Sequence, residues 1–308
     1  MIFAGYIALF IISLALLLKA SDVFVDGAKE IGVAMGISPF VIGVTIVALG
    51  TSLPELATSV SAVMADTSDV VVGNVVGSNI ANILLVLGLT AIVAGKIKMD
   101  FDIMDTDMPL LFISSILLYF VLSDGVFSFF EAIVFLIGFV VFLLNSFSGK
   151  KDTEDIPEKA RKIAWIYLIG GGLVVWLSAG YTIMAIKEIS VLAGVPTKVI
   201  AVSMVALGTS LPEVIVSIMA ARKGHSGIAV GNVLGSNIFN TYTVMAIPSF
   251  FGHLDIPSDF ISFHIPYMIA MTVVFAFISL SRSISKWEGV MLLVFYLYYL
   301  YEIINYTP

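Results

Sequence analysis

The segment VALGTSLPE at residues 47–55 occurs a second time, letter for letter, at residues 205–213. A longer match follows at the same offset of 158 residues, because VGNVVGSNIAN at 72–82 and VGNVLGSNIFN at 230–240 agree in nine of eleven positions. No gap is needed between the two matches. The chain therefore contains an internal duplication, and its two equivalent motif regions are 47–82 and 205–240.

The duplication divides the chain into two halves and a connection. A polar segment, GKKDTEDIPEKARK, separates the two apolar parts of the sequence. We therefore predict a first repeat at residues 1–147, a cytosolic linker at 148–162 and a second repeat at 163–308.

The composition is that of a membrane protein. The 308 residues are 59% hydrophobic and only 12% charged, and the mean hydropathy is +1.08. Ordinary soluble domains carry about 25% charged residues. These values exclude a soluble enzyme, a nucleic-acid-binding protein and a disordered chain. The sequence contains no Cys, which excludes disulfide scaffolds and thiolate metal sites.

Ten apolar runs have the length of a transmembrane helix, which needs roughly 17–25 residues. They lie at residues 2–18, 38–64, 70–94, 108–123, 126–147, 163–183, 195–221, 227–250, 260–281 and 287–305. The amphipathic stretch 22–34 is either a helix along the membrane surface or an extension of the first span.

The basic residues orient these spans. With the N-terminus outside, thirteen of the fifteen Lys and Arg residues fall in inside loops, and only Lys187 and Lys198 fall outside. This asymmetry is the positive-inside pattern. Each repeat holds five spans, an odd number, so the second repeat enters the membrane upside down. We predict an all-α polytopic membrane protein with ten transmembrane helices in two inverted five-helix repeats, an architecture typical of secondary transporters.

Each repeat places one carboxylate deep in the membrane. Glu55 is the only charged residue between Ile31 and Ala65, and Glu213 is the only one between Val199 and Ala221. A carboxylate at this depth costs at least about 2.5 kcal/mol and indicates a functional site. No Lys or Arg lies at the same depth to balance the charge. A bound cation is therefore the natural counter-ion.

The neighbours of both carboxylates supply oxygen atoms. Pro54 and Pro212 have no N–H, so the carbonyls four residues earlier lose their helical partner, and we expect a kinked or unwound helix there. Thr51 and Thr209 precede the two Glu residues by one helical turn. Carboxylate, hydroxyl and carbonyl oxygens suit Ca²⁺ and Na⁺, whereas transition metals prefer His or Cys. The three His residues are expected to be solvated or interfacial.

The second motif adds a polar helix face in each repeat. Asn74, Ser78 and Asn82 recur every four residues, and the second copy repeats this spacing. Such side chains can coordinate a cation without adding charge. They can also serve as hydrogen-bonding contacts between helices, an alternative that applies most to Asn74, Asn79, Asn232 and Asn237. The G-x-x-x-G pairs in the same motif allow close helix approach.

The doubled motifs ALGTSLPE and GNV-x-GSNI-x-N resemble the α-repeats of the sodium/calcium exchanger family, within the cation/calcium antiporter superfamily. The resemblance covers both repeats and implies that Glu55 and Glu213 bind Ca²⁺ and Na⁺ in turn. The ligands it implies are carbonyls of Ala48, Thr51, Ala206 and Thr209 and side chains of Thr51, Ser52, Ser78, Asn82, Thr209, Ser210, Ser236 and Asn240. Some members, notably potassium-dependent ones, carry Asp where this chain has Asn240.

The function implied by the resemblance is secondary active antiport of Na⁺ against Ca²⁺ at a midplane site. The alternative is a calcium/proton antiporter of the same superfamily, in which protonation of the two Glu residues releases Ca²⁺. An intramembrane protease would need Asp in a G-x-G-D-type context and a water-activating pair, and the sequence shows neither. We expect no enzymatic activity, no cofactor, no nucleic acid and no obligate protein partner. The expected partners are the two ions and the lipid bilayer of the cell membrane.

Overall fold

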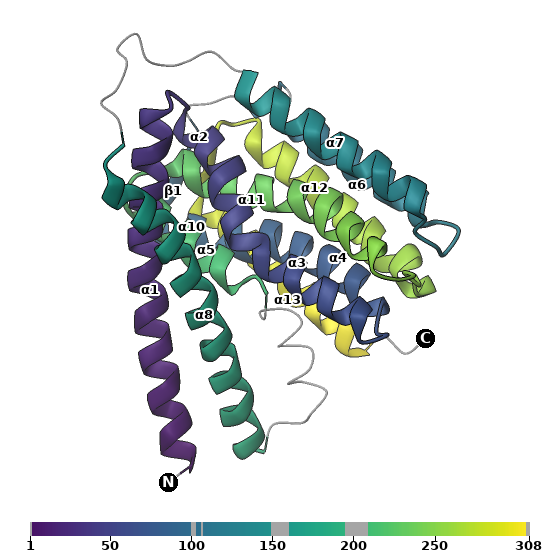
Figure 1. Cartoon of the computed structure of the whole chain (residues 1–308), viewed down its shortest axis with the longest axis horizontal. Helices are drawn as coiled ribbons and strands as arrows, with labels where there is room; N and C mark the ends of the chain where they lie inside the picture. The colour runs from purple at the N-terminus through teal and green to yellow at the C-terminus, as the bar shows by residue number, and fades with distance from the viewer. Residues whose placement is uncertain (1, 100–102, 106, 149–159, 195–208, 306–308) are drawn as a thin grey trace.

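The computed structural model describes residues 2–99, 103–105, 107–148, 160–194 and 209–305 (Figure 1). The first part contains α1 (Ile2–Ala34), α2 (Pro39–Ile42), η1 (Gly43–Val47), α3 (Ala48–Met64), α4 (Asp69–Ala81), η2 (Asn82–Val86), α5 (Leu87–Ala94), β1 (Lys96–Lys98), α6 (Asp107–Leu122) and α7 (Phe129–Ser148). The second contains α8 (Lys162–Leu192), α10 (Leu211–Arg222), α11 (Ser226–Phe239), η3 (Asn240–Val244), η4 (Ile247–Phe250), η5 (Phe260–His264), α12 (Ile265–Ser279), β2 (Ser283–Ser285) and α13 (Lys286–Asn305).

The described residues are helical except for turns and short loops, one two-stranded antiparallel sheet and an isolated bridge between Val126 and Asp255. In that sheet β1 pairs with β2 with Ile97 opposite Ile284. Seven helices among these residues are long and apolar enough to cross a membrane, and α6 is a shorter apolar helix. The expected span at 195–221 is described only from Thr209 onward, where it includes α10. The first span continues without a break to Ala34, so the stretch 22–34 extends that helix and is not a separate surface helix.

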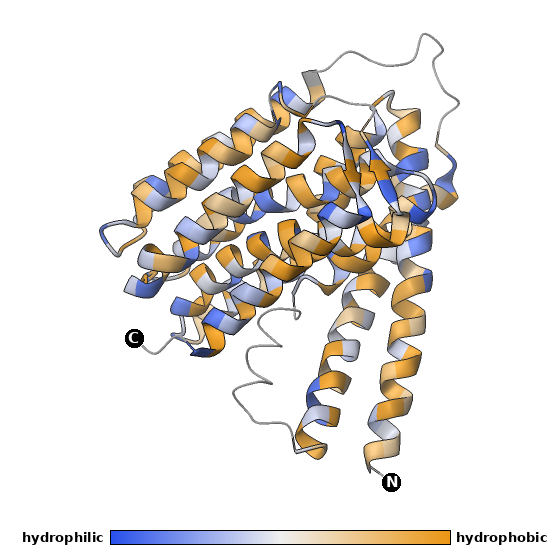
Figure 2. Ribbon diagram, turned by 180° about the vertical axis from the view of Figure 1, so that it is seen from behind, coloured by the Kyte–Doolittle hydropathy of each residue, from blue (hydrophilic) through white to orange (hydrophobic). Residues whose placement is uncertain are grey.

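The two helices that carry the second motif form the centre of the molecule. The continuous helix made of α4, η2 and α5 is 83% buried over its most apolar window, whereas the corresponding window of α1 is only 17% buried. In the second half every residue of α11 from Gly227 to Phe239 is buried. The polar motifs therefore lie inside, whereas the outer helices are mostly hydrophobic along their ribbons (Figure 2) and expose many large apolar side chains. This distribution fits a chain whose solvent is lipid.

Glycine allows α11 to pack directly on the backbone of the first half. A Cβ atom added at Gly235 would lie 2.2 Å from the carbonyl oxygen of Val44, and one at Gly231 would lie 2.6 Å from that of Phe40. The G-x-x-x-G pair of the second repeat thus does what the sequence predicts, because only glycine permits this approach. It brings α11 against η1 and the start of α3.

Two long helices, α1 and α8, form a pair at one side of the molecule. Both views show them side by side and reaching beyond the remaining helices (Figures 1 and 2). Ser13 and Thr182 link the pair through a hydrogen bond of 2.9 Å. The Cβ position of Gly171 lies only 3.1 Å from Cα of Phe24, so the two backbones are close at this level.

Candidate functional site

The first copy of ALGTSLPE lies on α3 and directs its polar side chains into the protein. Thr51, Ser52 and Glu55 are all buried. The carbonyl oxygen of Ala48 lies 3.3 Å from Oγ1 of Thr51. The expected unwinding is wrong for this copy, because α3 stays helical through Pro54 and the irregular turn is the π-helix η1 just before it. Membrane helices tolerate proline when a neighbouring irregular turn absorbs the change.

The second copy of the same letters adopts a different local structure. Thr209 and Ser210 precede α10, which begins at Leu211 with Pro212 in its first turn. Proline is well suited to this position, because the first N–H groups of a helix have no partner inside it. Glu213 also lies in this first turn and is completely buried. The helix dipole favours a carboxylate there. Ala206 lies outside the described residues.

Hydrogen bonds connect each copy of the first motif with the second motif of the other repeat. Thr51 donates to Oδ1 of Asn232 at 3.0 Å, and its equivalent Thr209 donates to Oδ1 of Asn74 at 3.2 Å. The two serines of the second motif take part in the same way. Ser236 lies 3.5 Å from Thr51, and Ser78 lies 3.0 Å from Thr209, oxygen to oxygen. The two repeats are therefore interlocked through reciprocal contacts.

A second pair of equivalent contacts fixes Asn74 and Asn232. The amide of Asn74 donates to Ser59 at 2.9 Å, and the amide of Asn232 donates to Ser217 at 3.0 Å. Both asparagines thus connect helices, as the alternative interpretation of this motif predicted. Ser59 and Ser217 were not singled out from the sequence. The sequence could have indicated them, because a serine follows the motif glutamate by four residues, one helical turn, in both repeats.

The two carboxylates are buried with few partners. Oγ of Ser52 donates to Oε1 of Glu213 at 3.1 Å. In the part of the chain that the structure describes, Oε2 of Glu213 and both carboxylate oxygens of Glu55 accept no hydrogen bond, and neither residue forms an ion pair. Buried carboxylates in such surroundings require a compensating charge. A cation bound between the repeats would provide it.

The asparagines at the C-terminal end of the second motif begin irregular helical turns. Asn82 begins the π-helix η2, and Asn240 begins the equivalent π-helix η3. Turns of this kind are frequent at functional sites. The amide of Asn82 donates to Oδ1 of Asn237 at 3.1 Å. Within the described ranges, Oδ1 of Asn82 and Oδ1 of Asn240 have no hydrogen-bond partner, although both residues are fully buried.

The donor set of this site is made of oxygen. Among the described residues, its unpartnered atoms include carboxylate and amide oxygens of Glu55, Glu213, Asn82 and Asn240, the ligand types that Ca²⁺ prefers, and also the amide nitrogen of Asn240. The described residues contain no group of three or more His, Cys, Asp or Glu that could hold a metal.

Two of the histidines differ in their exposure. His253 is exposed as expected, but the expectation is wrong for His264, which is buried and lies 3.1 Å from the hydroxyl of Tyr299. Packing among the aromatic rings of Phe260 and Phe263 explains its burial.

Comparison with known proteins gives consistent matches over the whole chain. The model of the sodium/calcium exchanger protein family matches residues 5–148 and 163–305. The sodium/calcium exchanger MaX1 of Methanosarcina acetivorans is 33% identical over 94% of this chain and 96% of its own length. The inner membrane protein YrbG of Escherichia coli is 33% identical over 92% of this chain and 91% of its own.

A solved structure shares the fold. The sodium–calcium exchanger NCX_Mj, soaked with Na⁺ and Sr²⁺, superimposes with a TM-score of 0.86 at 31% identity, covering 99% of this chain and 100% of the other. The apolar helices described above and these membrane-protein relatives make the chain a multi-pass membrane protein. Together with the doubled motifs, these matches establish that the chain belongs to the sodium/calcium exchanger family of cation/calcium antiporters.

Proposed function

We propose that this antiporter exchanges Na⁺ for Ca²⁺ at a site between its two repeats. The observation that carries the proposal is the set of buried oxygens without hydrogen-bond partners on Glu55, Glu213, Asn82 and Asn240. These residues come from the four helices that the reciprocal Thr–Asn contacts hold together. Each oxygen would be costly to bury alone, and a bound cation removes that cost.

The ligands of the transported ions follow from the same interlocked motifs. Glu55 and Glu213 provide the charge, and the neutral oxygens around them complete the coordination. The proposed ion-binding residues are Ala48, Thr51, Ser52, Glu55, Ser78, Asn82, Ala206, Thr209, Ser210, Glu213, Ser236 and Asn240. Ala48 and Ala206 contribute through their backbone carbonyls.

The proposed topology explains how one site serves both sides of the membrane. We infer ten transmembrane helices with the N-terminus outside, in repeats 1–147 and 163–308 joined by the cytosolic linker 148–162. The matching hydrogen bonds at Thr51 and Thr209 support this symmetry. Two halves of opposite orientation can open a central site to either side by equivalent movements.

Sodium is the proposed coupling ion because of the relatives and of the site itself. The relative MaX1 is named a sodium/calcium exchanger, and NCX_Mj is a sodium–calcium exchanger that was soaked with Na⁺ and Sr²⁺. The hydroxyl and amide oxygens beside the carboxylates of this chain suit a small hard cation. The competing function is proton-driven Ca²⁺ transport by the same two carboxylates.

Flux measurements separate the two functions. The purified protein is reconstituted in vesicles, and ⁴⁵Ca²⁺ uptake is compared under an outward Na⁺ gradient, an outward proton gradient and no gradient. The proposal expects uptake with Na⁺ inside and background uptake with the proton gradient alone. Uptake driven by protons and indifferent to Na⁺ would replace the proposal with calcium/proton antiport.

A further inference from the structure

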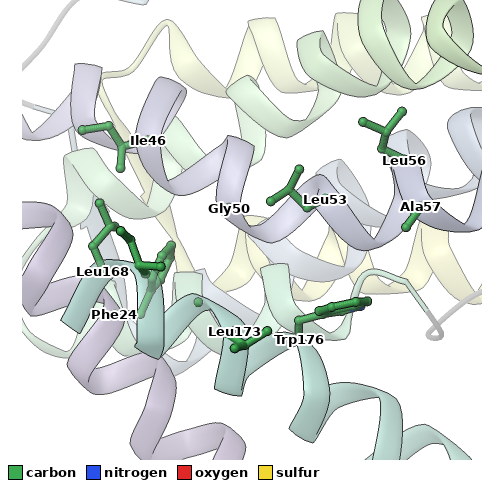
Figure 3. A pocket seen from close by; sticks show the side chains of 11 residues that line it. Phe24, Ile46, Gly50, Leu53, Leu56, Ala57, Leu168, Leu173 and Trp176 are labelled. Carbon is green, nitrogen blue, oxygen red and sulfur yellow. The ribbon is translucent and has the colours of Figure 1, made fainter. Parts of the chain in front are cut away.

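An apolar pocket lies on the face of α3 opposite to the proposed ion site. It has a volume of about 560 Å³ and is enclosed by α1, α8 and the continuous helix of η1 and α3. This volume is within the range of ligand-binding pockets, about 300–1,000 Å³. Figure 3 shows Leu53 and Leu56 of α3 on one wall and Leu173 and Trp176 of α8 on the other. None of the lining residues is ionisable.

The inner end of the pocket is formed by an aromatic ring and two glycines. Phe24 of α1 is only 2% exposed. A Cβ atom added at Gly50 would lie 2.8 Å from the ring of Phe24, and one added at Gly172 would lie 3.3 Å from it. The ring therefore touches both α3 and α8. Because Gly50 directly precedes Thr51 in α3, the pocket reaches the helix segment that carries the proposed ion ligands.

The outer end of the pocket is continuous with the lipid-facing surface. Leu53 is 56% exposed, Leu173 is 52% exposed and Trp176 is 47% exposed. The helices that carry them are candidate membrane spans, so this exposed surface faces hydrocarbon. A polar ligand would lose its hydrogen bonds to water and find no partner among these walls. A hydrocarbon chain would supply the contacts that the wall atoms of an unfilled pocket lack.

We propose that this pocket binds the acyl chain of a membrane lipid, which enters from the bilayer between α3 and α8. The bound chain separates the two helices and holds Phe24 against Gly50. It therefore favours the helix arrangement described here over arrangements that close the pocket. Its effect on exchange rests on the proposed function, whereas its binding does not.

Photolabelling tests the binding without any ion gradient. The protein is reconstituted with a trace of phosphatidylcholine that carries a diazirine in the middle of one acyl chain, and adducts are located by peptide mass spectrometry. We expect adducts to concentrate on residues 46–57 and 168–176, above the level on the exposed face of α7.

Variants of the pocket test the same labelling. Ala57→Phe and Gly172→Leu, which fill the pocket, should lose these adducts, and Leu173→Ala, which widens it, should gain them. Val141→Phe, on the exposed face of α7, should leave them unchanged.

The labelling pattern also shows what would overturn the proposal. Adducts that follow exposure alone, equal on α7 and at the pocket and unchanged in both filling variants, would mean ordinary contact with bulk lipid. Labelling of α7 serves as the folding control for each variant.

A transport measurement tests the effect on exchange. Branched phytanoyl chains are bulkier than straight oleoyl chains, so wild-type exchange should differ between vesicles made of the two lipids. The two filling variants should exchange at the same rate in both. An equal response of the wild type and both variants to the branched chains would overturn the effect on exchange. Failure of Na⁺-driven uptake altogether would contradict the proposed function and leave the labelling result intact.

Discussion

Oγ1 of Thr51 on α3 lies 3.0 Å from Oδ1 of Asn232 on α11, although the two residues are 181 positions apart in the sequence. The equivalent pair, Thr209 and Asn74, is joined in the same way at 3.2 Å. Each repeat thus completes the polar surroundings of the other. A site built from such reciprocal contacts cannot form from one repeat alone.

Removal of either threonine hydroxyl should have matching effects. We expect Thr51→Val and Thr209→Val each to reduce Ca²⁺ exchange, because each removes a hydrogen-bond donor from an asparagine oxygen and removes a proposed ligand. The loss of stability should be about 0.6–1.7 kcal/mol, as for hydrogen bonds between membrane helices. Thr58→Val, an exposed position on the same helix, is the control. Uptake of ⁴⁵Ca²⁺ and unfolding in detergent measure both effects, and a large loss in only one variant would contradict the reciprocity.

The close contact of α11 with η1 predicts that Gly235 tolerates no side chain. A Cβ atom in Gly235→Ala would lie 2.2 Å from the carbonyl oxygen of Val44, so one of the two backbones must move. We expect reduced thermal stability and loss of exchange. Gly180→Ala is the matched control, because no described atom outside its own helical surroundings lies within 4 Å of the added carbon. Equal melting temperatures for the two variants would argue against the tight packing of α11.

Asn240→Asp should make exchange dependent on pH. If Asn240 lines the proposed site, a third carboxylate near Glu55 and Glu213 raises their mutual repulsion, so one of the three holds a proton near neutral pH. Uptake should then increase with pH as that proton leaves. Asn145→Asp, at an exposed position of α7, controls for a general effect of added charge. A pH profile of Asn240→Asp identical to that of the wild type would count against Asn240 lining the site.

The charge of the site predicts how exchange responds to voltage. Two ionised carboxylates carry a formal charge of −2, which one Ca²⁺ balances, whereas three Na⁺ would leave a net charge of +1. Moving one charge across the membrane is worth about 2.3 kcal/mol per 100 mV. The resemblance to sodium/calcium exchangers favours three Na⁺, so we expect a strong response to potentials set with valinomycin and K⁺. A flat response would indicate electroneutral exchange with two Na⁺.

The sequence predicts the identity of the site residues better than their local structure. The repeat offset identifies Thr51, Ser52 and Glu55 and their equivalents, because two identical segments in an apolar chain have a common role. It does not reveal that Glu55 lies inside a helix while Glu213 begins one. That difference does not follow from the shared letters, because TSLPE is identical at 51–55 and at 209–213.

Other features of the fold depend on tertiary packing and leave little trace in the sequence. The π-helical turns that begin at Asn82 and Asn240 are not indicated by the hydrophobic pattern. The burial of His264 among aromatic rings is a similar case, since its position near a span end indicated solvation. The contact of Thr51 with Asn232 could not be predicted either, because a repeat alone does not say which copy faces which.

We propose that Glu55 and Glu213 together hold the transported Ca²⁺. The most direct measurement is the initial rate of Na⁺-driven ⁴⁵Ca²⁺ uptake by Glu55→Gln and Glu213→Gln, compared with the wild type and with Glu131→Gln at the start of α7. Each site variant removes one of two charges that balance the dication, while a buried neutral amide costs less than a buried carboxylate. We expect correctly folded variants with uptake at background for both site substitutions and near wild type for Glu131→Gln. Wild-type uptake by either site variant would contradict it.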